Sequence, residues 1–155
     1  MIPLANTYNN NSPVCLFFAG GGTNGAVKNY SAYTISKIAS IKMVELLDAE
    51  IPNITFTILG PGRVETKIHK PTLESSFEEI GEEFYKTKTM LENNTCFPLE
   101  DVIQCCDWLI YQDRKLIGGR NFSAEYDPWN DSKIFKIIDN FDIFKLRRHG
   151  NDFFK

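Results

Sequence analysis

Two short apolar runs constrain the fold of this chain more than any other feature. The first is Val14-Cys15-Leu16-Phe17-Phe18-Ala19, between Pro13 and a glycine cluster, and the second is Ile54 to Leu59, which ends at Gly60-Pro61-Gly62. Short runs rich in β-branched and aromatic residues, without charge and bounded by proline or glycine, are typical of strands buried on both faces of a parallel sheet. We therefore predict two buried strands at these positions.

A helical pattern fills the space between the two runs, from Ser31 to about Glu50, and Pro52 ends it. One apolar stripe follows the helix, and other apolar residues lie elsewhere on the wheel; the stripe is formed by Ile35, Ala39, Met43 and Leu46. A helix with so little polar surface is expected to pack on two sides.

The later part of the chain continues the alternation of helix and strand. Glu74 to Leu91 is acidic early and basic late and predicts a surface helix. Pro98 opens another helix, Asn121 to Ala124 predicts a third strand, and a short helix is expected around Ile134 to Ile138. This order predicts an α/β layer built on a three-stranded parallel sheet with packed helices.

Composition narrows the class of protein. The net charge of −3 over 155 residues gives no general attraction to nucleic acid, and no apolar run is long enough to span a bilayer. The first residues lack the apolar segment of a signal peptide. The cysteines show no C-x-x-C spacing, which argues against a metal site and favours reduced thiols in a cytoplasmic protein; they are Cys15, Cys96, Cys105 and Cys106.

A glycine cluster from Gly20 to Gly25 fits G-x-G-x-x-G after a strand, which is the dinucleotide-binding fingerprint taken literally. The fingerprint requires a helix that begins within the glycines, so that its N-terminus faces the pyrophosphate. Here helical periodicity starts only near Ser31, and Gly60-Pro61-Gly62-Arg63 stands where an acidic residue should hold the ribose. Arg63 as a 2′-phosphate ligand is a weak alternative, and we favour an active-site loop.

Tyr33 and Lys37 stand four residues apart, one turn along a helix. A tyrosine beside a lysine ammonium is expected to have its phenol pKa lowered from about 10, because the cation favours the phenolate. Such a phenol can exchange a proton with a carbonyl or an alcohol. The spacing alone also fits an ordinary amphipathic helix. The surrounding residues must therefore distinguish a reactive pair from such a helix.

Four motifs in order resemble the short-chain dehydrogenase/reductase family, from about Val14 to Ala124. Tyr33-Thr34-Ile35-Ser36-Lys37 is similar to its Tyr-x-x-Ser-Lys helix, and Pro61 to Thr66 to its Pro-Gly-x-x-x-Thr cofactor loop. Pro98 to Val102 resembles the start of its late helix, and Ile117 to Asn121 the approach to its last strand. The resemblance implies the C-terminal half of a Rossmann-like, doubly wound parallel sheet.

The resemblance also implies roles. Tyr33 would be the general acid/base for hydride transfer between NAD or NADP and a small carbonyl or alcohol, and Lys37 would hold the nicotinamide ribose and lower the tyrosine pKa. The nicotinamide end would be contacted by Pro61, Gly62, Val64 and Thr66. Residues 67–91 would form a mobile lid over the substrate, in which His69 is expected to be incidental. Relatives of this kind form homo-oligomers.

Two departures from the family pattern weaken the expectation that this chain catalyses the reaction by itself. Ala19 and Gly20 stand where the family has its catalytic serine, so Thr23 or backbone N–H groups of Gly20 to Gly22 are the remaining donor candidates. The N-terminal nucleotide-binding half is expected to be absent, with 1–13 a lead-in, 14–126 a partial domain and 127–155 a C-terminal extension. Three hypotheses follow: an oxidoreductase half that needs its N-terminal half, a non-catalytic fragment acting as an interaction or oligomerisation module, and a self-standing nucleotide-binding module.

Overall fold

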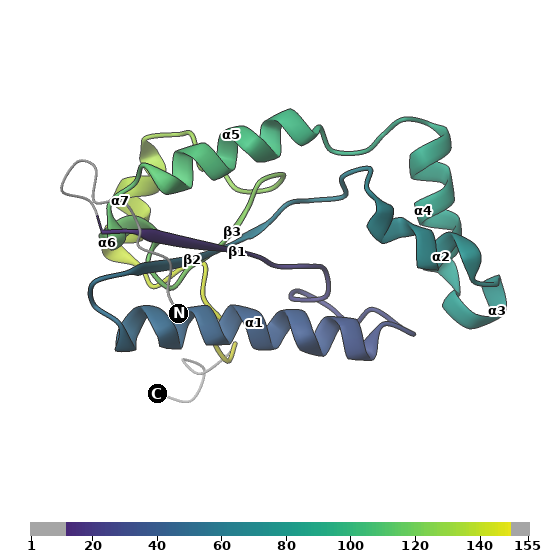
Figure 1. The fold of residues 1–155 in the computed structure, drawn as a ribbon, viewed down its shortest axis with the longest axis horizontal. Coiled ribbons are helices and arrows are strands. Elements are labelled where there is room, and N and C mark those ends of the chain that lie inside the picture. The colour runs from purple at the N-terminus through teal and green to yellow at the C-terminus, as the bar shows by residue number, and fades with distance from the viewer. Residues whose placement is uncertain (1–11, 150–155) are drawn as a thin grey trace.

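The computed structural model describes residues 12–149 and shows an α/β fold with a three-stranded, all-parallel sheet and packed helices (Figure 1). The strand order is β1 (Val14–Phe18), β2 (Thr55–Gly60) and β3 (Asn121–Ser123). In register, Val14 pairs with Thr55, and Ile58 pairs with Asn121. The three-stranded parallel sheet confirms the predicted architecture. Of the two strands predicted to be buried, β2 is buried, whereas β1 is only partly buried and Phe18 is exposed, so the prediction of a buried first strand is wrong within residues 12–149.

Helices follow each strand in turn. Their bounds are α1 Ser31–Glu50, the 3-10 turn η1 Lys67–His69, α2 Lys70–Glu74, α3 Phe77–Ile80, α4 Glu82–Glu92, α5 Leu99–Ile110, α6 Arg114–Ile117 and α7 Lys133–Asn140. Within residues 12–149, no helix has the length and apolar character needed to cross a membrane.

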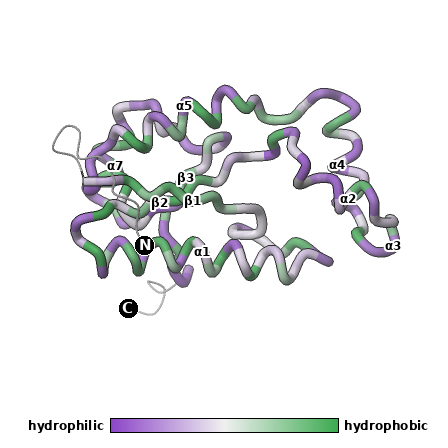
Figure 2. The backbone as a smooth tube through the Cα atoms, viewed as in Figure 1, coloured by the Kyte–Doolittle hydropathy of each residue, from purple (hydrophilic) through white to green (hydrophobic). Residues whose placement is uncertain are grey.

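The sheet separates two hydrophobic cores, because alternate residues of a strand point to opposite faces. On one face, Ile41 and Val44 of α1 pack against Phe56 and Ile58 of β2. On the other face, α5 packs with β3 and α7, and the buried residues there include Val102, Cys105, Leu109, Phe122 and Ile134. The strands form an apolar layer between the helices (Figure 2).

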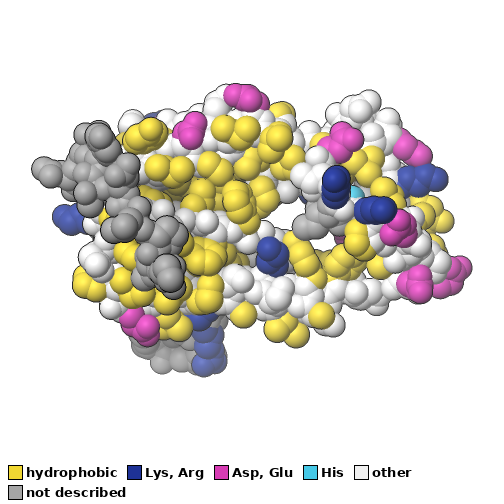
Figure 3. All heavy atoms as spheres, viewed as in Figure 1, with side chains coloured by type: hydrophobic (Ala, Val, Ile, Leu, Met, Phe, Trp, Pro, Cys, Tyr) yellow, Lys and Arg dark blue, Asp and Glu magenta, His cyan; other side chains and the backbone are white. Residues whose placement is uncertain are grey.

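The predicted two-sided packing of α1 is not observed within residues 12–149. Ile41 and Val44 face the sheet, whereas Ile35, Met43 and Leu46 of the predicted apolar stripe are exposed. The reason is geometric, since a helix lying on a sheet buries one stripe and the opposite stripe needs another element to cover it. Hydrophobic side chains continue over the face between α5 and α1, where β1 lies (Figure 3).

The prediction of one helix from Glu74 to Leu91 is wrong, because α2 ends at Glu74 and the segment after it forms two helices, α3 and α4. Gly81 has a φ of 74°, a conformation that favours glycine and interrupts the helix. Ser76 starts α3 with a capping box, in which its side chain and that of Glu79 each accept a backbone N–H. The three helices form a separate group at one end of the molecule (Figure 1), which we call the lid (residues 67–92).

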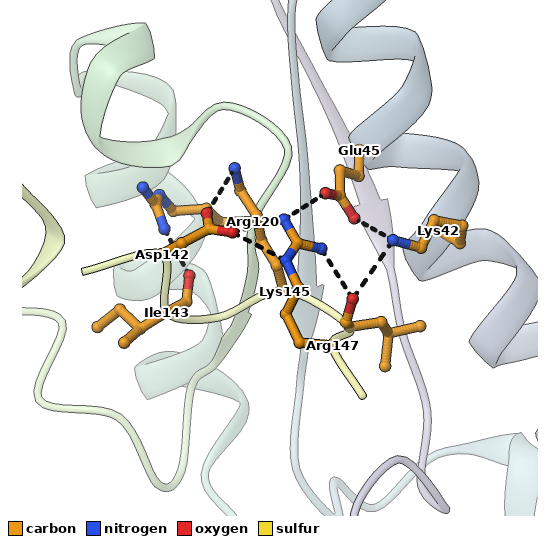
Figure 4. Close-up of polar contacts among 8 residues, drawn as sticks. Lys42, Glu45, Arg120, Asp142, Ile143, Lys145 and Arg147 are labelled. Atoms are coloured by element: carbon orange, nitrogen blue, oxygen red, sulfur yellow. Dashed lines mark hydrogen bonds and ion pairs between the residues drawn. The ribbon is translucent and has the colours of Figure 1, made fainter. Parts of the chain in front are cut away.

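The outer edge of β3 is covered by the chain itself. Asn121 N–H donates to Phe144 O at 2.7 Å, and Ser123 N–H donates to the Asp127 carboxylate at 2.7 Å. Phe144 belongs to a strap, residues 142–147, whose Arg147 forms ion pairs with Glu45 of α1 at 2.7 Å and with Asp142 at 2.6 Å (Figure 4). The strap therefore joins α1 to the β3 edge.

Among residues 12–149, no strand pairs with the outer edge of β1, which we call the open edge. Pro13 O accepts from Thr55 N–H, and Ala19 N–H donates to Leu59 O, both at 2.8 Å, so the odd-numbered positions of β1 face β2. The N–H and C=O groups of Val14 and Leu16 consequently point to the other side, where residues 12–149 place no strand.

Candidate functional site

An open cavity of about 1500 Å³ lies at the carboxyl ends of the strands. Its walls come from the loop after β1, from Tyr33 and Lys37 of α1, from the connection after β2, from the end of β3 and from the lid. Ligands of open parallel sheets bind at this end, because loops that follow neighbouring strands meet there. The cavity is therefore the candidate site.

Tyr33 lies in the first turn of α1, with 37% of its surface exposed. Its hydroxyl oxygen lies directly over Gly20: a Cβ atom at residue 20 would be 2.3 Å from Tyr33 Oη and 2.9 Å from Lys37 Cγ. Around Gly21, by contrast, a Cβ atom would meet nothing within 4 Å. A glycine at position 20 is therefore what makes room for the phenol in this position, and a larger side chain there would require the Tyr33 ring to shift.

Lys37 lies one turn after Tyr33, as the sequence predicts, and its Nζ is 5.8 Å from the centre of the Tyr33 ring. The ammonium donates a hydrogen bond to Phe18 O at 3.1 Å. Phe18 stands at an even-numbered position of β1, so this carbonyl belongs to the open edge. Lys37 thus links the edge strand to the tyrosine.

The expected lowering of the Tyr33 pKa is not observed. Burial raises the pKa of the phenol above its ordinary value, because the partly dry surroundings disfavour the phenolate. The nearby ammonium does not reverse this shift, since it hydrogen-bonds to Phe18 O rather than to the phenol oxygen. In this chain, Tyr33 is therefore protonated at neutral pH, and its phenol is a weaker acid than that of a free tyrosine.

The predicted cofactor-loop residues all line the cavity together with Tyr33 and Lys37, and they are Pro61, Gly62, Val64 and Thr66. Gly62 has a φ of 77°, which favours glycine, and a Cβ atom there would lie 2.7 Å from Glu125 Oε2. The sequence therefore named residues that the fold brings to one place, although they come from two separate segments.

The glycine loop does not form a phosphate-binding helix start. Residues 26–30 separate Gly25 from the first residue of α1, Ser31. Arg63, the weak alternative for a 2′-phosphate, forms an ion pair with Glu83 of the lid at 3.1 Å. Both observations agree with the expectation of a loop rather than a fingerprint.

The loop nevertheless offers hydrogen-bond donors to the cavity. Among the described residues, the N–H groups of Gly20, Gly21 and Gly22 have no acceptor. Thr23 lines the cavity as well, while Ala19, at the position expected for serine, is buried. Backbone N–H groups and Thr23 therefore both stay available as substitutes for the missing serine.

Sequence reasoning missed two acidic residues at the end of β3. Glu125 and Asp127 line the cavity, and burial raises the pKa of the half-buried Asp127 carboxyl. Their position directly after a predicted parallel strand was a usable signal, because the carboxyl ends of parallel strands meet at one edge. His69 contacts Val64 O through Nε2 at 2.8 Å, so its ring serves to join the lid to the connection after β2.

The four cysteines form no disulfide, and residues 12–149 contain no group of three or more histidine, cysteine or acidic side chains placed to hold a metal ion. Comparison with known proteins found no matching family model, no matching curated protein and no matching solved structure. The case for a function therefore rests on the residues of this cavity.

Proposed function

We propose that this chain is the catalytic, C-terminal part of an NAD(P)-dependent short-chain oxidoreductase, with Tyr33 as the general acid/base. The observation that carries the proposal is that Tyr33, Lys37 and the Pro61-Gly62 loop line one cavity at the carboxyl ends of parallel strands. Two motifs that are distant in sequence, the Tyr33/Lys37 pair and the Pro61-Gly62 loop, meet at the place where such sheets bind ligands.

The residues of the cavity fit the nicotinamide end of such a cofactor. Gly62 lines the cavity, and Lys37 offers an ammonium beside the phenol. The pyrophosphate end finds no helix N-terminus behind a glycine loop within the described residues, since α1 begins only at Ser31. The proposal therefore includes a further α/β half that binds the adenosine part and pairs with the open edge of β1.

A bound nicotinamide would supply the hydride for reduction of a small carbonyl compound. Tyr33 Oη would donate its proton to the substrate oxygen as the hydride reaches the carbonyl carbon, which yields the alcohol. The phenol stays protonated at neutral pH and can donate its proton in this direction, and burial, which raises its pKa, makes it a weaker acid than a free tyrosine. Oxidation of an alcohol would need the phenolate and is favoured at higher pH.

The test uses the full-length chain purified under mild conditions from its native cells, so that any bound partner is retained. We expect NADH or NADPH to be consumed with a panel of ketones and aldehydes, and Tyr33→Phe to reduce kcat by about 10² to 10⁴, the usual contribution of a general acid. Tyr111→Phe is the matched control, because Tyr111 is 77% exposed and does not line the cavity. Full activity of Tyr33→Phe, or no reaction with either cofactor, would refute the proposal.

A second candidate function, an interaction module without catalysis, is favoured by one observation. Exposed apolar residues lie on α1 (Ile35, Met43 and Leu46) and on α5 (Ile103 and Ile110). Hydrophobic side chains continue over the face between these two helices, where β1 lies (Figures 1 and 3). Unpaired strand edges with apolar flanks are sites of strand pairing with another chain. In that case, the Tyr33→Phe variant would bind its partner as the unaltered chain does, and neither would consume a cofactor.

A further inference from the structure

Tyr30 lies where α1, the lid and the candidate site meet. It is the residue before α1, and its ring stands edge-on to the Tyr33 ring, with the centroids 6.4 Å apart and an interplanar angle of 81°. Its hydroxyl forms a 2.6 Å hydrogen bond with Thr72 Oγ1 of α2. One side chain thus contacts both the lid and the proposed proton donor.

The lid has few other attachments. Its three helices pack on one another at the end of the molecule (Figure 1) and join the body (residues 12–60 and 99–149) through two connecting segments, 61–66 and 93–98. His69 and Glu83 of the lid bond to Val64 and Arg63, which belong to the first connecting segment. Among residues 12–149, Tyr30–Thr72 is the hydrogen bond that joins the lid directly to the body.

Thr72 is well placed to hold the lid. It is a polar residue with only 8% of its surface exposed, so loss of its partner would leave a buried hydroxyl without a hydrogen bond. The far end of the lid also approaches the loop before α1, since a Cβ atom at Gly81 would lie 3.6 Å from Asn29 Nδ2. The lid therefore rests along the loop that leads into α1.

The position of the lid determines access to the cavity. Phe77, Ile80, Gly81 and Lys86 of the lid line the same cavity as Tyr33. Movement of the lid away from α1 would remove this wall and expose Tyr33 to water.

We propose that Tyr30 is a positioning residue that couples the lid to Tyr33: its hydroxyl holds α2 beside the cavity, and its ring fixes the orientation of the Tyr33 ring. The importance of Tyr33 rests on the proposed function, whereas the attachment of the lid does not. The two roles use different parts of the Tyr30 side chain, so different substitutions separate them.

The first test measures amide hydrogen exchange across residues 70–92 of the full-length chain. Tyr30→Phe and Thr72→Val should each speed exchange in the lid about fivefold, the effect expected for one lost neutral hydrogen bond. The double variant should exchange no faster than either single variant, because both remove the same bond. Tyr85→Phe is the matched control: Tyr85 is a lid tyrosine whose ring packs on Phe77 and Phe84, and we expect unchanged exchange. Unchanged exchange in Tyr30→Phe would overturn the proposal.

The second test separates this inference from the proposed function. If the chain reduces carbonyl compounds, Tyr30→Phe and Thr72→Val should raise KM severalfold with little change in kcat, whereas Tyr30→Leu, which also lacks the ring, should lower kcat as well. Faster lid exchange in a protein without any turnover would refute the function and support the coupling. Turnover with unaltered exchange and KM in Tyr30→Phe would refute the coupling and support the function.

Discussion

Gly20 and Gly21 are neighbouring glycines, but the Tyr33 hydroxyl lies beside Gly20 only. A methyl group at position 20 would overlap the Tyr33 hydroxyl, whereas one at position 21 would enter open space. We predict that Gly20→Ala turns the tyrosine ring toward water and lowers its pKa toward the ordinary value, because less of the ring is buried. Gly21→Ala should leave this pKa unaltered.

An NMR titration of ring-labelled tyrosine, assigned with Tyr33→Phe, would measure both variants. The overlap involves the end of an exposed side chain, so the stability of Gly20→Ala should fall by no more than about 1 kcal/mol. The same Tyr33 pKa in Gly20→Ala as in the unaltered chain would show that position 20 does not govern the placement of the ring.

Cys105 is a fully buried thiol in the core beneath α5, and burial raises its pKa to about 12 from an ordinary value of 9.0. Above pH 9 the unfolded chain loses this proton while the folded chain keeps it, so the free energy of unfolding falls as pH rises. Between these two pKa values, this thiol should lower the free energy of unfolding by about 1.4 kcal/mol per pH unit.

Urea unfolding of the unaltered chain and of Cys105→Ala, at about pH 8 and about pH 10, would test this dependence. At the lower pH the variant should be less stable than the unaltered chain, because it lacks a buried side chain. Its free energy of unfolding should fall less than that of the unaltered chain when the pH is raised. An equal alkaline loss in the two proteins would contradict the assignment.

At the scale of single elements, β1 is the strand whose behaviour is easiest to alter. Val14 N–H points to the open edge, so Val14→Pro should keep the pairing with β2 while removing a donor from the edge. We predict that the unaltered chain associates through this edge and that Val14→Pro weakens the association at least about tenfold, as measured by sedimentation equilibrium.

Cys15→Pro is the matched control for the strand. Residue 15 faces β2, so proline there removes a hydrogen bond of the sheet and should lower the free energy of unfolding. Association of Val14→Pro as strong as that of the unaltered chain would show that the β1 edge is not the contact.

The elements also differ in how far sequence could predict them. The strands and α1 follow from uninterrupted apolar or periodic runs, which local physics specifies. The break between α3 and α4 was missed because the charges and apolar spacing around Gly81 suit one long helix, and only a positive φ at that glycine reveals the turn. The exposure of Ile35 and Leu46 was also missed, because a helical wheel does not say which apolar stripe meets the sheet.

For the whole molecule, the sequence named residues that line one cavity but could not predict the contacts among them. Tyr33, Lys37 and Gly62 could be named because their motifs are local. Lys37 donating to Phe18 O could not be predicted, since the direction of a strand carbonyl depends on the register of the sheet. Tyr30 and Thr72 meet across 42 positions of the chain, and nothing local indicates such a pair.

The strap across β3 limits how many neighbours this sheet can accept. Asn121 and Ser123 have their outward N–H groups bonded within the chain, whereas Val14 and Leu16 do not, so within residues 12–149 the sheet has a valence of one. A sheet with one free strand edge can form a pair and no larger assembly, while a sheet with two free edges can add units without limit. By covering the β3 edge, the strap would limit any assembly through strand pairing to two units.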